Sequence, residues 1–302
     1  MVGLISNAGS GVRAAWQSLP RPERLRISGW AAWIAAATLA FVQPLSQLVA
    51  LAGDNELHSH IPLVPVVTAY LLWIQRGTLP AAGRTSPSGA LALGSVSVAA
   101  LAWGLTSSVL SATDRLSVMT LAYVAATAAG GFLFLGARWM AAAAFPIAFL
   151  LFMVPLPDAA VDWLERASVQ ASADVSAWLF RATGTPMLRD GTIFALPTIV
   201  LEVARECSGI RSSWVLFITS LVASHMFLKS TWRRLVLVAF VIPLAIVRNA
   251  VRILVIGLLC VHVGPHMIDS FVHHRGGPIF FVLSLVPMFL LLNWLRHRDR
   301  PA

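Results

Sequence analysis

Eight long apolar runs constrain this chain more than any other feature of its sequence. A helix needs roughly 20 mostly apolar residues to cross the hydrocarbon core of a bilayer. The chain has 302 residues, of which 58% are hydrophobic and only 12% charged, so it is far more apolar than an ordinary globular protein. The sequence therefore predicts an all-α polytopic membrane protein with about eight transmembrane helices. These lie near residues 28–50, 61–75, 88–110, 116–136, 139–155, 209–228, 235–262 and 278–295.

The distribution of positive charge predicts the side of the membrane on which each loop lies. If the N-terminus is cytoplasmic, 13 Lys and Arg residues fall on the cytoplasmic side and 7 on the outer side, as the positive-inside rule requires. The N-terminal segment has no basic stretch followed directly by an apolar core, so we expect the first span to be retained and not removed as a signal peptide. The net charge of +9 then reflects cytoplasmic loops that face anionic membrane lipid, and we expect no nucleic-acid partner.

The longest polar segment, residues 155–206, lies between the fifth and sixth runs, which places it outside the cytoplasm. Its first half has apolar residues at helical spacing, which predicts an amphipathic helix, or two, lying in the membrane interface. Its second half contains Asp190-Gly191 among β-branched residues, which predicts a short β-hairpin. We find no internal repeat, and we expect a single transmembrane domain over residues 1–302 with this segment as a small extracytoplasmic cap.

A cysteine follows the cap directly, in the stretch ECSGIRSS (residues 206–213). Cys207 is predicted to stand at a helix N-terminus, which favours an anion, and Arg211 lies one turn away on the same face, so both favour the thiolate. Glu206 opposes them. The pattern fits a nucleophile, but it also fits a packing thiol or a disulfide with Cys260.

Two arginines, Arg248 and Arg252, lie one turn apart inside the seventh run. An arginine in a transmembrane helix costs on the order of 2.5–3.5 kcal/mol on insertion scales, and it normally faces a partner or a cavity. The pair can form salt bridges with Glu202 or Glu206, or it can bind a carboxylate, a phosphate or an oxyanion. Asn249 lies three residues before Arg252 and can orient it.

Several histidines are predicted to lie on the outer side with the thiol. His273 or His274, in the loop after the seventh run, can serve as the base that takes the proton of Cys207. The alternative is that these rings are merely interfacial. No HExxH or CxxC pattern is present in the sequence, so we expect no metal site, and no phosphate-cradling loop points to a nucleotide cofactor.

Taken together, these segments resemble the exosortase/archaeosortase family of membrane cysteine transpeptidases. The resemblance is carried by EVARECSGIRSS, VRNAVRI and FVHHRGGPIFF, and by LHSHIPLVPVVTAYLLW, which is similar to the family's early SHxxxxP segment. It implies that the catalytic cysteine is Cys207 and that the catalytic arginine is Arg252, in the NxxR pattern. The catalytic histidine is then His273, four residues before Gly277, although the doublet leaves His274 open.

The resemblance also implies the reaction. Family members cut C-terminal sorting tails of exported proteins on the outer face of the bacterial inner membrane, with the active site facing the periplasm. Such a tail has a short motif of the PEP-CTERM type, a transmembrane helix and a basic cluster. The enzyme forms a thioester and passes the new carboxyl end to an unidentified acceptor. The residues that would bind this substrate or orient the catalytic groups are Arg248, Arg211, Asn249, Gly209 and, in the early segment, His60.

Three other functions fit the same membrane architecture. A transporter or channel would line an anion path with Arg248 and Arg252, but transporters often show paired half-sequences, which this chain lacks. An intramembrane cysteine protease would use water as the acceptor, and the sequence does not separate it from a transpeptidase. A nonenzymatic assembly factor for exported exopolysaccharide would be indifferent to the loss of the thiol.

Overall fold

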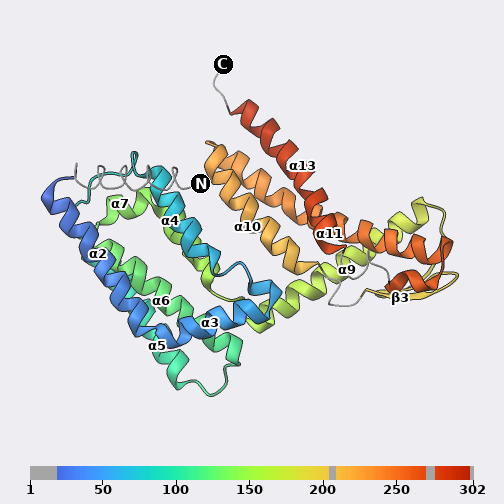
Figure 1. Cartoon of the computed structure of the whole chain (residues 1–302), viewed down its shortest axis with the longest axis horizontal. Helices are drawn as coiled ribbons and strands as arrows, with labels where there is room; N and C mark the ends of the chain where they lie inside the picture. The colour runs from blue at the N-terminus through green and yellow to red at the C-terminus, as the bar shows by residue number, and fades with distance from the viewer. Residues whose placement is uncertain (1–18, 204–208, 270–275, 300–302) are drawn as a thin grey trace, which may run out of the picture. The chain divides into compact units, whose positions relative to one another are not determined.

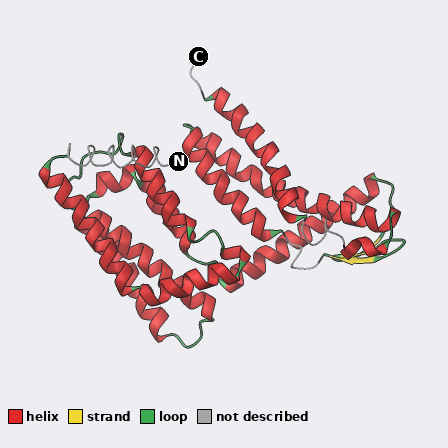
Figure 2. Ribbon diagram, viewed as in Figure 1, coloured by secondary structure: helices red, strands yellow, loops and turns green. Residues whose placement is uncertain are grey.

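The computed structural model describes residues 19–203, 209–269 and 276–299, and the chain divides into two compact units, Met1–Asp158 and Ala159–Ala302. Both units are built mainly from helices, as Figures 1 and 2 show. Among the described residues, six helices are long and apolar enough to cross a membrane, or up to eight if each of two bent helix pairs forms one span. The prediction of an all-α polytopic membrane protein is confirmed. That residues 1–302 form a single domain stays a prediction.

The first unit contains only helical elements among its described residues. These are α2 (Arg21–Ala40), α3 (Val42–Asp54), η1 (Glu56–His58), α4 (Leu63–Gln75), α5 (Pro87–Thr106), α6 (Ala112–Phe134), α7 (Ala137–Ala142), α8 (Ala144–Phe149) and η2 (Leu150–Met153). The most buried of the long helices is α6, whose small residues allow its neighbours to approach closely. A Cβ atom on Gly130 would lie 2.2 Å from the indole ring of Trp33 on α2, and that indole donates to the carbonyl of Ala126 at 2.8 Å.

Two predicted spans are not single straight helices. The run 28–50 is divided into α2 and α3, which meet at a 76° bend, and the run 139–155 is divided into α7, α8 and η2. In each case the first helix ends four residues before a proline: α2 ends at Ala40 before Pro44, and α7 ends at Ala142 before Pro146. A proline has no N–H to donate to the carbonyl four residues earlier, and its ring clashes with that carbonyl. The helix therefore ends there and a new one begins.

The second unit follows. It contains α9 (Asp158–Ala182), β1 (Leu188–Asp190), β2 (Ile193–Ala195), β3 (Val200–Glu202), α10 (Ile210–Phe227), α11 (Thr231–His262), η4 (Pro265–Asp269) and α13 (Gly277–Arg298). The amphipathic segment forms one helix, α9, and not two. The expected hairpin is present as β1 and β2, with Gly191 at a φ of 58° in its turn. The prediction missed a third strand, because the chain turns again after β2, where the N–H of Leu196 donates to the carbonyl of Ile199 at 2.8 Å, and β3 returns along β2.

The sheet is held against α9 and α11 by a common apolar core. Phe180 on α9 and Phe194 on β2 are fully buried, with ring centroids 5.6 Å apart. A Cβ atom on Gly257 of α11 would lie 2.6 Å from the ring of Phe180, so the absence of a side chain lets this core rest on the backbone of α11. The hydroxyl of Thr198 also donates to the carbonyl of Cys260 at 3.0 Å. The sheet is thereby fixed to the C-terminal half of α11, beyond its two arginines in the sequence.

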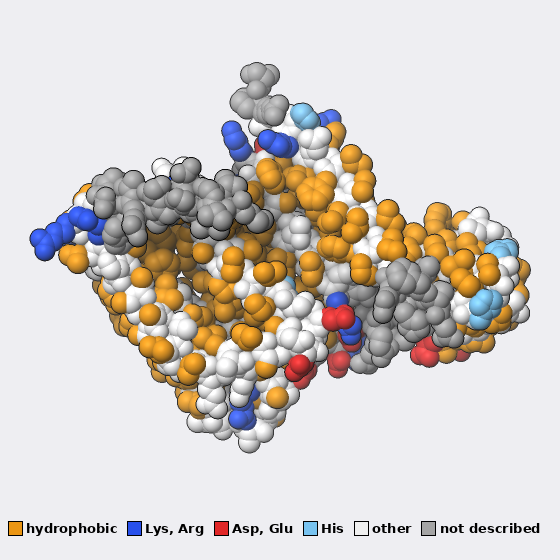
Figure 3. Space-filling model, in the orientation of Figure 1, with side chains coloured by type: hydrophobic (Ala, Val, Ile, Leu, Met, Phe, Trp, Pro, Cys, Tyr) orange, Lys and Arg blue, Asp and Glu red, His pale blue; other side chains and the backbone are white. Residues whose placement is uncertain are grey.

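Helices α10, α11 and α13 pack side by side around a second core (Figure 1). Figure 3 shows hydrophobic side chains covering the sides of these helices and basic side chains where α13 ends. At that end the carboxylate of Asp299 accepts hydrogen bonds from the N–H groups of Lys229 and Ser230, at 2.5 and 3.3 Å, and pairs with Arg233. Asp299 thus joins the end of α13 to the start of α11.

We predict that Asp299→Asn loosens this junction in a pH-dependent way. The hydrogen bond from the Lys229 N–H, assisted by those from Ser230 and Arg233, holds the pKa of Asp299 below its ordinary value against the opposing effect of desolvation. The stabilisation from the carboxylate is therefore complete above the ordinary pKa and is lost as pH falls through the lowered one. The thermal midpoint of detergent-solubilised Asp299→Asn should lie below wild type near neutral pH, and the gap should close in acid. A gap that does not change with pH would contradict this account.

Candidate functional site

The candidate site is built around the middle of α11, where Arg248, Asn249 and Arg252 lie within little more than one helical turn. Arg248 is only 8% exposed and Asn249 only 3%. A charged side chain buried to this degree needs polar partners, since an isolated buried charge is unstable. The partners of these residues show what this part of α11 holds in place.

Arg248 contacts the first turn of α10. Its Nη2 donates to the carbonyl oxygen of Gly209 at 3.0 Å and to Oγ of Ser213 at 2.9 Å. The same carbonyl accepts from the N–H and the hydroxyl of Ser213, at 3.0 and 2.7 Å. Arg248 therefore ties the middle of α11 to the beginning of α10. Its Nη1 is buried without a hydrogen-bond partner among the described residues. One terminal nitrogen of the guanidinium therefore forms hydrogen bonds to α10, and the other forms none with this part of the chain.

Gly209, which precedes α10, is fixed by two constraints. Its φ of 66° lies in the left-handed region, which costs an L-residue with a side chain about 1–2 kcal/mol. In addition, a Cβ atom at this position would lie 3.2 Å from Nη2 of Arg248 and 3.3 Å from Oδ1 of Asn249. The glycine therefore lets the start of α10 pack closely on α11. Its predicted role in admitting the substrate backbone stays a prediction.

Asn249 connects α11 to α9. Its Nδ2 donates to Oγ of Ser172 at 3.0 Å, and the hydroxyl of Ser176 in turn donates to the carbonyl of Ser172 at 2.7 Å. Both serines are fully buried. Neither serine was predicted as part of the site, although their four-residue spacing among the apolar positions of α9 is a signal of a buried polar contact between helices. That Asn249 orients Arg252 stays a prediction.

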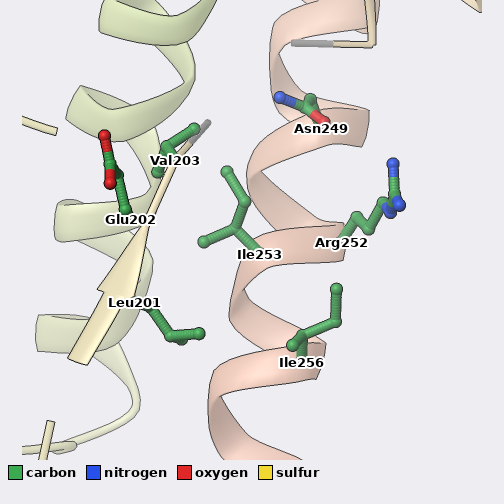
Figure 4. Close-up of a pocket in the computed structure, with 7 residues that line it drawn as sticks. All are labelled: Leu201, Glu202, Val203, Asn249, Arg252, Ile253 and Ile256. Carbon is green, nitrogen blue, oxygen red and sulfur yellow. The ribbon is translucent and has the colours of Figure 1, made fainter. Parts of the chain in front are cut away.

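Arg252 lines a pocket between α11 and the sheet. Leu201, Glu202 and Val203 form one wall, and Asn249, Arg252, Ile253 and Ile256 form the other. Figure 4 shows Glu202 and Arg252 pointing away from each other. The described residues contain no ion pair between Glu202 and either arginine, so the suggested pairing with Glu202 is not formed. The alternative pairing with Glu206 lies outside the described residues. The walls are mainly aliphatic, which leaves the guanidinium and the amide as the polar groups contributed by α11.

The remaining predicted residues fall into two groups. Cys207, Glu206, His273 and His274 lie outside the described residues. Arg211 is exposed in the first turn of α10. Cys260 is a free and fully buried thiol, so the suggested disulfide with Cys207 is not formed. Within the described part of the chain no group of three or more His, Cys, Asp or Glu residues is placed to hold a metal ion.

His60 belongs to the first unit, where it faces two backbone carbonyls. Its Nδ1 lies 3.0 Å from the oxygen of Leu57, and its Nε2 lies 3.2 Å from that of Phe152. A neutral imidazole carries one proton and can donate to only one of these carbonyls. His60 thus links the start of the second span to η2, and its predicted contact with substrate stays a prediction.

The chain on both sides of residues 204–208 is anchored to the same stretch of α11. Val203 lines the pocket with Arg252, and Gly209 is hydrogen-bonded to Arg248. Position 207 thus lies in the sequence between Val203 and Gly209, and these two residues lie against adjacent turns of α11. Gly209 lies against Arg248 and Asn249, whereas the predicted meeting of Cys207, Arg252 and His273 involves residues outside the described part of the chain.

We predict that Gly209→Ala destabilises the second unit more than Gly184→Ala. Both glycines have a left-handed φ, 66° and 68°, but a Cβ atom at Gly184 meets nothing within 4 Å. Each variant loses about 1–2 kcal/mol to backbone strain, and only Gly209→Ala also crowds Arg248 and Asn249. Thermal unfolding in detergent measures both. Equal losses would show that the contact with α11 is not tight.

Comparison with known proteins gives one match. The family model described as transmembrane exosortase matches residues 52–290, which is most of the chain and includes every residue of the candidate site. No curated protein and no solved structure matches.

Proposed function

This chain belongs to the transmembrane exosortase family, and on that premise we propose that it is a cysteine transpeptidase. Its substrates would be exported proteins whose tails carry a short motif, a transmembrane helix and a basic cluster. The enzyme would cleave at the motif and transfer the new carboxyl end to an acceptor. The resemblance in sequence around Cys207, Arg252 and His273 is the basis for naming these three as the catalytic residues.

The observation that carries the proposal is the double anchoring of the segment around Cys207. Val203 precedes this segment and lines the pocket of Arg252, whereas Gly209 follows it and is held by Arg248. Only Ser208 separates Cys207 from Gly209 in the sequence. A thiol attached at this point would act beside a guanidinium and an aliphatic pocket, which is the setting that acyl transfer requires.

The chemistry follows in two steps. The thiolate of Cys207 attacks the scissile carbonyl, and the guanidinium of Arg252 stabilises the negative charge on its oxygen. The C–N bond then breaks, a thioester to Cys207 remains, and His273 or His274 delivers a proton to the leaving amine. In the second step the acceptor nucleophile, an amine or water, attacks the thioester, gives its proton back to the same histidine and releases the thiolate. No cofactor is needed for either step.

Arg248 serves first as a positioning residue in this mechanism, because its Nη2 holds the carbonyl of Gly209. Its Nη1, buried without a partner among the described residues, is the arm that would contact substrate. Arg211, exposed in the first turn of α10, would attract an acidic residue of the sorting motif. Asn249 would support binding from α11, and a role of His60 in binding stays a prediction.

The proposed location is the inner membrane of a bacterium, with the site facing the periplasm. With the site on the periplasmic side, 13 Lys and Arg residues lie on the cytoplasmic side and 7 on the outer side, and this excess supports the orientation. A three-stranded sheet also needs surroundings that satisfy its edges, which the hydrocarbon core does not provide. A tail with a single transmembrane helix would reach the site laterally through the lipid.

We predict that Cys207→Ala and Cys207→Ser abolish tail cleavage. Wild type and variants are co-expressed with an exported reporter that ends in a Pro-Glu-Pro motif, a transmembrane helix and a basic cluster, and the reporter mass is measured. Wild type should shorten the reporter, and so should Cys260→Ala, which removes the buried thiol that the mechanism does not use. The mass of the new C-terminus distinguishes water from another acceptor. Cleavage by Cys207→Ala at the wild-type rate would exclude the thioester mechanism.

We also predict that Arg252→Gln lowers the cleavage rate by about 10²–10³, the usual effect of removing one oxyanion donor. Arg252→Lys should retain part of the rate, since it keeps the charge but not the geometry. Arg189→Gln is the matched control: Arg189 pairs with Asp174 and does not line the pocket. An unchanged rate for Arg252→Gln in a variant that folds normally would remove Arg252 from the mechanism.

A further inference from the structure

The outer edge of β3 is unpaired in the sheet. The strand order is β1-β2-β3, so β3 has a neighbour on one side only. Two hydrogen bonds show which backbone groups of this strand face β2. The N–H of Val203 donates to the carbonyl of Thr192 at 3.0 Å, and the N–H of Leu196 donates to the carbonyl of Ile199 at 2.8 Å. The opposed pair Phe194 and Leu201 lies midway between these two bonded pairs, two residues from each. In an antiparallel ladder bonded and non-bonded pairs alternate, so Leu201 also bonds to β2.

The backbone groups of Val200 and Glu202 therefore point away from β2. None of the described residues forms a hydrogen bond to the N–H or the carbonyl of either residue, and both side chains are exposed, Val200 to 64%. An exposed row of unpaired N–H and carbonyl groups is a template for one more strand. Extended peptides bind to such edges by main-chain hydrogen bonds in many recognition domains.

The free edge belongs to the strand that borders the candidate site. Leu201 and Glu202 of β3, together with Val203, form one wall of the pocket that contains Arg252 (Figure 4). The same strand leads in the sequence to Cys207, five residues after Glu202. The other edge strand, β1, contributes no residue to the pocket. A peptide paired with β3 would therefore run beside the pocket.

The size of the edge decides which occupant fits it. Only two residues of β3 face outward, so an added strand gains up to four backbone hydrogen bonds. That is enough to fix the register of a short extended segment, and it is far too little contact for a stable interface between two folded chains. Backbone pairing also tolerates different side chains, which suits an enzyme that acts on tails of several proteins.

Building on the proposed function, we propose that the substrate's sorting segment, just before its transmembrane helix, binds to β3 as a fourth strand. Its backbone exchanges hydrogen bonds with Val200 and Glu202. Directly opposite residues share a face of the sheet, and like charges there are destabilising. The substrate residue opposite Glu202 is therefore not acidic, and the residue opposite Leu201 points to the face of the sheet that packs on the core.

The first test removes a backbone donor without breaking the sheet. Glu202→Pro deletes an N–H that points away from β2, at a position where an edge strand tolerates proline, and Glu202→Ala changes the side chain alone. We expect Glu202→Pro to process the Pro-Glu-Pro reporter at least about tenfold more slowly than Glu202→Ala, as expected for losing a hydrogen bond and blocking the edge. Equal rates in the two variants, with equal thermal midpoints, would overturn the proposal.

The second test detects pairing without catalysis. In a Cys207→Ala background, Val200→Cys is oxidised with copper phenanthroline in the presence of reporters that carry single cysteines along the sorting segment. Paired strands place opposite Cα atoms about 5.5 Å apart, within disulfide range. We expect Val200→Cys to form cross-links at every second reporter position. Leu188→Cys is the control, because Leu188 is 79% exposed on the other edge strand, and we expect no alternating cross-links from it.

The outcomes separate the two proposals. Cross-links without alternation, or equal cross-linking from Leu188→Cys, would overturn strand addition while leaving the thioester mechanism in place. Alternating cross-links together with cleavage by Cys207→Ala would leave strand addition in place and overturn the thioester mechanism.

Discussion

The need to satisfy every backbone N–H and carbonyl governs this structure from its spans to its site. In hydrocarbon an unpaired backbone group costs several kcal/mol, so a membrane helix can end only where something else accommodates its end. Pro44 and Pro146 force such ends at Ala40 and Ala142, and the chain responds with a new helix at each break. The breaks divide two predicted spans into pieces.

The same requirement explains why an arginine is buried in α11. At the start of α10 the carbonyl of Gly209 receives four donors: two from Ser213, one from Ser212 and one from Arg248. The guanidinium thereby connects two helices through a backbone atom, and among the described residues it has no acidic partner. Carbonyl and hydroxyl oxygens hold a buried cation in place without adding a negative charge beside it. On the proposed function, that positive charge would act on a substrate or on a developing oxyanion.

Much of this arrangement is encoded locally and was predictable. Helical spacing alone places Arg248 and Arg252 on adjacent turns, and apolar length alone locates α5, α6, α10, α11 and α13 closely. The contacts that depend on tertiary structure were not predictable. Nothing in the sequence near Asn249 identifies Ser172 as its partner. The turn that leads to the third strand is marked by Pro197, but a proline alone does not show that the chain returns to pair with β2. The bends were predictable in principle, because each proline lies four residues after the last helical carbonyl.

The open edge of β3 and the buried arginine are complementary features of one site. Arg248 and the core around Phe180 and Phe194 fix the start of α10 and the sheet to the same helix, so the two sides of the segment that contains Cys207 have rigid supports. Nη1 of Arg248 and the outward backbone of Val200 and Glu202 have no hydrogen-bond partner in the part of the chain that the structure describes, and they are polar groups that a peptide can satisfy. A rigid frame with unfilled hydrogen bonds binds an extended chain at little entropic cost. Substrate binding would then complete the sheet.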